Sequence, residues 1–218
     1  LSRGLGDVYK RQDGNLKEMQ ISRFTVDLPG AFSLKGGGIL ENLTDSLTRS
    51  GTIGLDMVTR NLNFLTGLTG VTPDGSLVIP DSMSLKMKME MNGPQYKAKL
   101  DLKEGKGSMN VNAALNSSTE VYTADLKIND LQLHHFLPKD SIYELSLSAD
   151  AKGRGLDVMS FHSLANLNLS LDQLHYARYH LSNVHLTGNL KGALATAQLT
   201  SDNELLKMTA DAEYNLAH

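Results

Sequence analysis

The sequence predicts a mainly all-β fold with antiparallel strands, and three observations carry this prediction. Apolar and polar residues alternate with a period of two over most of the 218-residue chain. Short groups of Gly, Asn and Ser, which favour turns, separate the alternating runs. Over much of the second half the runs begin roughly 11–13 residues apart, a spacing typical of antiparallel sheets.

The segment LKMKMEM (residues 85–91) shows this alternation most clearly, with its Leu and Met on one side of a strand and its Lys and Glu on the other. The turn residues 92–94 follow, and a second alternating run starts at Tyr96. Two such runs around an Asn-Gly turn predict a β-hairpin. Further alternating runs cover residues 24–28, 109–115, 122–128, 143–149, 165–171, 184–190, 193–199 and 206–214.

Three stretches depart from the alternation. Residues 40–49 and 60–68 carry apolar residues three or four apart, which predicts one or two short helices near 40–70, or turns. Residues 131–139 are expected to close a strand and to form a helical turn near 134–139, ahead of Pro138.

Composition excludes several classes of function. The net charge of −3 gives no electrostatic case for a nucleic-acid partner, which would need a clustered basic face, so we expect none. The chain has no cysteine, hence no disulfide and no thiolate metal site. No run of about 18 apolar residues is present to form a membrane-spanning helix. Residues 1–12 (LSRGLGDVYKRQ) resemble a translated library adapter and are expected to be non-native, and residues 13–218 are expected to be part of one domain of a longer chain.

No set of residues predicts catalysis, a cofactor or a metal ion. The histidines lack an HExxH pattern, and five-residue spacing alternates faces on a strand; they are His134, His135, His175, His180 and His185. The segment KGRGLD (152–157) predicts a turn or bulge and no phosphate loop. The acid pairs Asp125/Asp130 and Asp140/Glu144 have no nucleophile or base beside them, so the protein is expected not to be an enzyme.

Alternation gives each strand one apolar face, which must be shielded from water by another part of the protein or by a ligand. Aromatic residues make up only 6% of the chain and Trp is absent, so this face consists mainly of Leu, Met and Ala. Flexible Met suits a surface that adapts to variable shapes, such as a channel for acyl chains. Ordinary core packing in a closed β-sandwich is the alternative.

The stretch from Tyr122 to Tyr214 resembles the C-terminal region of TamB-type translocation and assembly proteins of Bacteroidetes-like bacteria, within the AsmA-like superfamily. The resemblance lies in YTADLKINDLQLHHFLP (122–138), in residues 149–202, which begin ADAKGRGLD, and upstream in residues 77–116. It implies an elongated, open, taco-like β-groove in the periplasm of a diderm bacterium, involved in phospholipid transport and outer-membrane biogenesis. An inner-membrane anchor helix and the contact with an Omp85-type outer-membrane protein are expected to lie outside this chain.

Together these observations predict a non-enzymatic groove segment whose partners are phospholipid acyl chains. The alternative is a scaffold that docks strands of outer-membrane β-barrel proteins on open sheet edges, as part of protein secretion. The residues predicted to line a lipid groove are Leu85, Met87, Met89, Met91, Tyr96, Ala98, Leu100, Met109, Val111, Tyr122, Leu126, Ile128, Leu145, Leu147, Leu167, Leu169, Leu171, Leu186, Leu199 and Met208.

Overall fold

A computed structural model describes residues 12–15, 18–61 and 78–216, which form one antiparallel sheet of 14 strands and a single short helix. The strand order follows the chain from β1 to β14, and only β11 lies off this path, paired with β10. The predicted all-β, elongated and open antiparallel sheet is therefore confirmed. The closed β-sandwich alternative is wrong, because no second sheet covers the first in the described residues.

Most strands are long. Their bounds are β1 Gln12–Asn15, β2 Glu18–Leu28, β3 Phe32–Glu41, β4 Ser50–Thr59, β5 Met83–Asn92, β6 Gln95–Glu104, β7 Gly107–Asn116, β8 Val121–Gln132, β9 Ile142–Arg154, β10 Leu164–Tyr176, β11 Tyr179–Leu181, β12 Val184–Lys191, β13 Leu194–Asp202 and β14 Lys207–Asn215, and the 3-10 helix η1 is Leu133–His135.

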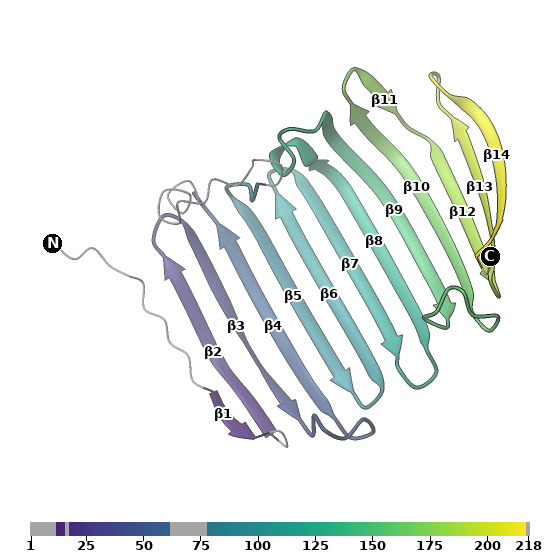
Figure 1. The fold of residues 1–218 in the computed structure, drawn as a ribbon. Coiled ribbons are helices and arrows are strands. Elements are labelled where there is room, and N and C mark those ends of the chain that lie inside the picture. Colours follow the sequence, from purple (N-terminus) through teal and green to yellow (C-terminus); the bar gives the residue numbers. More distant parts are fainter. Residues whose placement is uncertain (1–11, 16–17, 62–77, 217–218) are drawn as a thin grey trace.

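The strands lie side by side in chain order and make an arched sheet, with β12–β14 turning away from the plane of the earlier strands (Figure 1). At about 4.8 Å between neighbours, the sheet extends roughly 60 Å across its strands. Consecutive strands are antiparallel neighbours, so most connections are short, whereas β4 and β5 are separated by residues 60–82.

The predicted hairpin at residues 92–94 is confirmed. Strand β5 pairs with β6 in unbroken register from Met83↔Glu104 to Asn92↔Gln95. Gly93 has a φ of +55°, a conformation that L side chains rarely adopt. An added Cβ there would lie 2.7 Å from the carbonyl oxygen of Leu47, so the turn also packs closely against the β3–β4 loop.

The region near 40–70 differs from expectation. Residues 42–49 form turns without a helix, and β4 then occupies Ser50–Thr59. The expected helical stretch 60–68 falls largely outside the described residues. The helical turn expected near 134–139 is present one residue earlier, as η1. None of the described residues belongs to a helix long and apolar enough to cross a membrane.

The packed core is small for a chain of this length. Among the described residues only six apolar side chains are buried: Ala31, Met83, Leu102, Ile128, Leu131 and Ala193. Four of them, Met83, Leu102, Ile128 and Leu131, form one cluster. The sheet therefore leaves much of its apolar surface without a packed layer over it.

Candidate functional site

All the residues predicted to line a groove lie on one face of the sheet. In an antiparallel pair, residues directly opposite each other point to the same side. The register joins Met87 to Leu100, Leu100 to Val111, and Val111 to Leu126. The same series continues through Ala149, Leu169, Leu186, Leu199 and Ala210, so this apolar face is continuous from β5 to β14.

The apolar face is ordered into rows that run across the strands. One row consists of small side chains in directly paired positions of β6–β9, namely Ala98, Ala113, Ala124 and Ala151. Larger residues flank this row on both sides. One flank contains Leu100, Val111 and Leu126, and the other contains Tyr96, Leu115 and Tyr122. The alternation of large and small rows makes a trough perpendicular to the strands.

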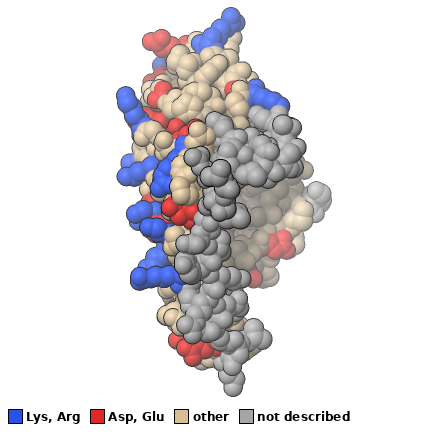
Figure 2. Space-filling view, turned by 90° about the vertical axis from the view of Figure 1, so that its left-hand side faces the viewer, with Lys and Arg blue, Asp and Glu red and all other residues tan. Residues whose placement is uncertain are grey.

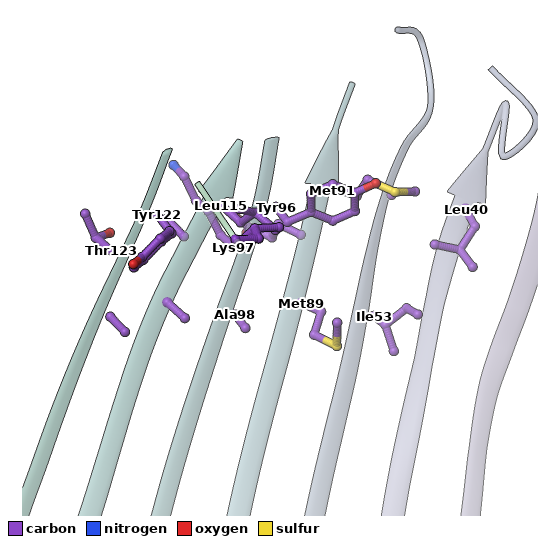
Figure 3. A pocket seen from close by; sticks show the side chains of 16 residues that line it. Leu40, Ile53, Met89, Met91, Tyr96, Lys97, Ala98, Leu115, Tyr122 and Thr123 are labelled. Atoms are coloured by element: carbon purple, nitrogen blue, oxygen red, sulfur yellow. The ribbon is translucent and has the colours of Figure 1, made fainter. Parts of the chain in front are cut away.

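Above part of the alanine row lies an apolar hollow of about 390 Å³, bounded by residues of β3–β8. Its floor includes Ala98, Ala113 and Ala124. Figure 3 shows Ile53, Met89 and Ala98 at the same level on neighbouring strands, as their register requires. Met89 is 44% exposed, so its side chain borders the hollow without being packed away from water.

The other end of the same strands is covered. Residues 78–82 and 133–137, together called the cap, lie over the beginning of β5 and the end of β6. Leu133 and Phe136 of the cap pack against the cluster of Met83, Leu102, Ile128 and Leu131. Val78 N–H donates to Phe136 O (2.7 Å), which ties the two parts of the cap together.

Two polar residues hold the cap to the sheet. Thr59, 1% exposed, donates its hydroxyl to Pro80 O (2.7 Å) and accepts from Met83 N–H (2.9 Å). Glu104, on the apolar face and buried, has its Oε1 2.7 Å from Nδ1 of His135. Within the described residues Glu104 Oε2 is buried and has no hydrogen-bond partner. The cap is thus fixed by specific contacts at one rim of the apolar face.

The opposite face is charged. On β5 and β6 it carries Lys86, Lys88, Glu90, Lys97, Lys99 and Asp101. Several of these are paired: Lys88 contacts Glu90, and Lys99 Nζ lies 3.5 Å from Asp101. The contact with Lys88 lowers the pKa of Glu90, first by hydrogen bonding and then by charge. Figure 2 shows Lys and Arg side chains protruding along one side of the sheet. This face is therefore suited to water.

The sequence predicted one set of groove-lining residues, but the structure places them in different surroundings. Met89, Met91, Tyr96, Ala98 and Tyr122 border the hollow. In contrast, Ile128 is buried in the cluster beneath the cap, with other predicted lining residues packed around it: Leu85, Leu100, Met109, Leu126, Leu145 and Leu147. Met87 and Val111 lie in the row of Leu100, and the other predicted residues, on β10 and β12–β14, lie farther along the same face.

Sequence analysis missed part of the apolar face. Strand β4 contributes Ile53, Leu55 and Met57, which are paired with Met89, Met87 and Leu85. Their alternation in SGTIGLDMVT was the available signal. Leu156, from the β9–β10 connection, also borders the hollow and could not be assigned by strand periodicity.

The histidines come closer together than expected. His175 and His180 lie opposite each other in the β10–β11 hairpin, with ring centroids 4.1 Å apart. Tyr143 lies 4.9 Å from the His175 ring and 5.5 Å from that of His134. The five-residue spacing argument was wrong for this pair, because it assumed one strand where the chain reverses.

The described residues contain no group of three or more His, Asp or Glu placed to hold a metal ion. The turn or bulge predicted for residues 152–157 is only partly right: Lys152 to Arg154 still belong to β9 in unbroken register, and the chain leaves the strand at Gly155, which has a φ of +88°. Asp125 faces Asp150 on the charged side of the sheet, away from the apolar hollow.

Comparison with protein-family models, curated proteins and solved structures found no match to this chain. The fold and the site define an open sheet with one apolar face.

Proposed function

We propose that this chain is a non-enzymatic segment of a periplasmic bridge protein whose apolar face carries phospholipid acyl chains toward the outer membrane. The observation that supports this most directly is the continuous apolar face, joined in register from strand to strand. An apolar surface of this extent in contact with water is unfavourable and marks a site for an apolar partner.

The direction of the rows fits a lipid chain. The rows run across the strands, along the roughly 60 Å dimension of the sheet. An extended acyl chain lying in a row would contact one apolar side chain on each strand in turn. Each methylene fully removed from water contributes about 0.8 kcal/mol. Because contacts of this kind are similar at every strand, a chain can shift along the row without meeting a large barrier.

The resemblance to TamB-type proteins supports the cellular setting of this proposal. In that setting the chain lies in the periplasm of a diderm bacterium, within a protein anchored in the inner membrane. Segments outside this chain make the inner-membrane anchor and the contact with an Omp85-type outer-membrane protein.

A second candidate function, a scaffold for outer-membrane protein assembly, rests on the edge of the sheet. Among the described residues β14 pairs only with β13, so its other side offers backbone N–H and C=O groups. A strand of a client protein can add to such an edge. This function predicts binding of strand-forming peptides and no bound lipid.

The test is to purify the protein without detergent and to identify co-extracted lipids by mass spectrometry. We expect stoichiometric phospholipid in the natural sequence and its loss in Met87→Asp/Met89→Asp. The matched control is Lys88→Asp. It changes the net charge of the same strand by the same amount, but on the charged face, opposite Lys99. The control is expected to retain the lipid.

Circular dichroism on the same samples separates loss of binding from loss of fold. Met89→Asp is expected to remain β-rich, because its exposed side chain lets the carboxylate reach water. A natural-sequence protein that is folded and free of lipid would contradict the lipid function and favour the scaffold. Unfolding of Met89→Asp alone would remove the support for an open groove at this position.

A further inference from the structure

Resting on the proposed function, we propose that the apolar hollow and Arg49 form one phospholipid-binding position. One acyl chain occupies the hollow over the alanine row, and the lipid phosphate binds the guanidinium group of Arg49. The site is therefore selective for an anionic head group as well as for an apolar chain.

The size and lining of the hollow fit a single chain. Its volume of about 390 Å³ is near the lower end of ligand pockets, which span about 300–1,000 Å³. The small side chains of Ala98, Ala113 and Ala124 form its floor, and Met91 and Tyr96 stand at its end beside the β5–β6 turn. Figure 3 shows Met91 and Tyr96 close together at this end.

Arg49 is held at that same end by several contacts. Its Nε donates to Gly93 O (3.2 Å), and its backbone carbonyl accepts from Gly93 N–H (2.7 Å). Its guanidinium carbon lies 5.1 Å from the centre of the Tyr96 ring. Tyr96 therefore contacts both the cation and the hollow, which places a positive charge beside an apolar chain site.

Among the residues that the structure describes, the guanidinium group has N–H donors without a hydrogen-bond partner. Arginine has five N–H donors, and only the one on Nε is used by Gly93. In the described part of the chain no carboxylate lies within 4 Å of Arg49. Asp45, in the same loop, instead accepts from Leu47 N–H and the Thr48 hydroxyl. The fixed fork of the free donors matches the paired oxygens of a phosphate.

The position in the sheet argues for a lipid and against a peptide. Strands β5–β8, which form the floor, are hydrogen-bonded to neighbours on both sides. The floor has no free backbone groups with which a bound strand could pair, and a peptide there would leave its own polar groups unsatisfied. An acyl chain needs no hydrogen bonds, and its phosphate meets the charge at the rim.

The experiment compares two single-chain lipids of equal chain length, palmitoyl lysophosphatidylglycerol and monopalmitoylglycerol, which lacks the phosphate. Binding is measured below the critical micelle concentration of each lipid, by native mass spectrometry and by competition with a fluorescent fatty acid. We expect the natural sequence to prefer the phosphate-bearing lipid by about tenfold or more, the usual contribution of a charged hydrogen bond. Arg49→Gln is expected to lose this preference while binding monopalmitoylglycerol as before, and Arg49→Lys to retain part of it.

Two controls complete the design. Lys99→Gln removes a positive charge from the same strand as Tyr96 but on the charged face, away from the hollow, and is expected to keep the preference. Ala113→Leu fills the hollow and is expected to weaken both lipids. An unchanged preference in Arg49→Gln, or unchanged binding in Ala113→Leu, overturns this inference and leaves the proposed function standing. Absence of any lipid binding by the natural sequence overturns the proposed function itself.

Discussion

The apolar side chains of β5 lie in two different environments at the two ends of the strand. Met83, at the capped end, is 5% exposed and packs in the buried cluster. Met89, six residues later on the same face, is 44% exposed and borders the hollow. One methionine fills a core and the other remains available to a ligand. The same strand face is thus packed at one end and exposed at the other, and what lies over it decides which.

The largest expected difference between the two ends comes from a buried charge. Ile128→Asp places a carboxylate beside Met83, Leu102 and Leu131. A buried charge without an ion-pair or hydrogen-bond partner is strongly unfavourable. We therefore expect a loss of more than about 4 kcal/mol in the free energy of unfolding.

Substitution by Asp at the open end of the strands is the comparison for Ile128→Asp. For Met89→Asp we expect a loss of about 1 kcal/mol or less, because the carboxylate remains in contact with water. Urea unfolding followed by circular dichroism measures both variants. Equal losses would show that the open end is packed like the capped end.

A smaller effect is expected from the hydroxyl that fastens the cap. Thr59→Val keeps the side-chain shape but removes the bonds to Pro80 O and Met83 N–H. Leaving these groups unsatisfied is expected to lower the free energy of unfolding by about 1–3 kcal/mol. The control Thr52→Val, exposed on the charged face of the same strand, should change it by less than about 0.5 kcal/mol. Similar values for the two variants would mean that the cap does not depend on Thr59.

The smallest effect concerns the β3–β4 loop at the open end. The backbone N–H of Leu47, followed by the Thr48 hydroxyl, lowers the pKa of Asp45 below its ordinary value. A lowered pKa in the folded state means that the ionised carboxylate stabilises the fold at neutral pH. This stabilisation is lost as the pH falls below about 3.9 and through the folded-state pKa.

Asp45→Asn tests this contribution. We expect a slightly lower melting temperature than that of the natural sequence at pH 7, with the difference disappearing in acid. Thermal unfolding between pH 7 and pH 2.5 measures it. A difference that is the same at every pH would assign the effect to loop geometry and not to charge.

The sequence predicted the strands from β5 to β8 well, because alternation there is uninterrupted and the turns carry Gly or Asn. It missed β3 for a physical reason, although the alternation of β4 was visible. Gly36 and Gly38 occupy apolar-face positions in β3, and glycine has no side chain to show the period. An added Cβ at Gly36 would overlap the ring of Phe24, so the glycine leaves room for that aromatic side chain.

Some residues of the candidate site could likewise be predicted from the sequence, and others could not. Which residues share the apolar face followed from the sequence, because side chains on a pleated strand alternate by local geometry alone. Arg49 and Leu156 could not be found this way, since both come from connections between strands. The alanine row, too, exists only through the register of β6–β9, which joins positions far apart in the chain.

The sequence by itself determined that the strands are amphipathic, where many of them turn, and that the charges gather on one side. These are local properties of side-chain type and pleat. The tertiary structure decided that the sheet is open, that the cap covers one rim, and that a hollow lies beside Arg49. Those features depend on contacts between distant segments, such as Thr59 with Pro80 and Arg49 with Gly93, which no local period encodes.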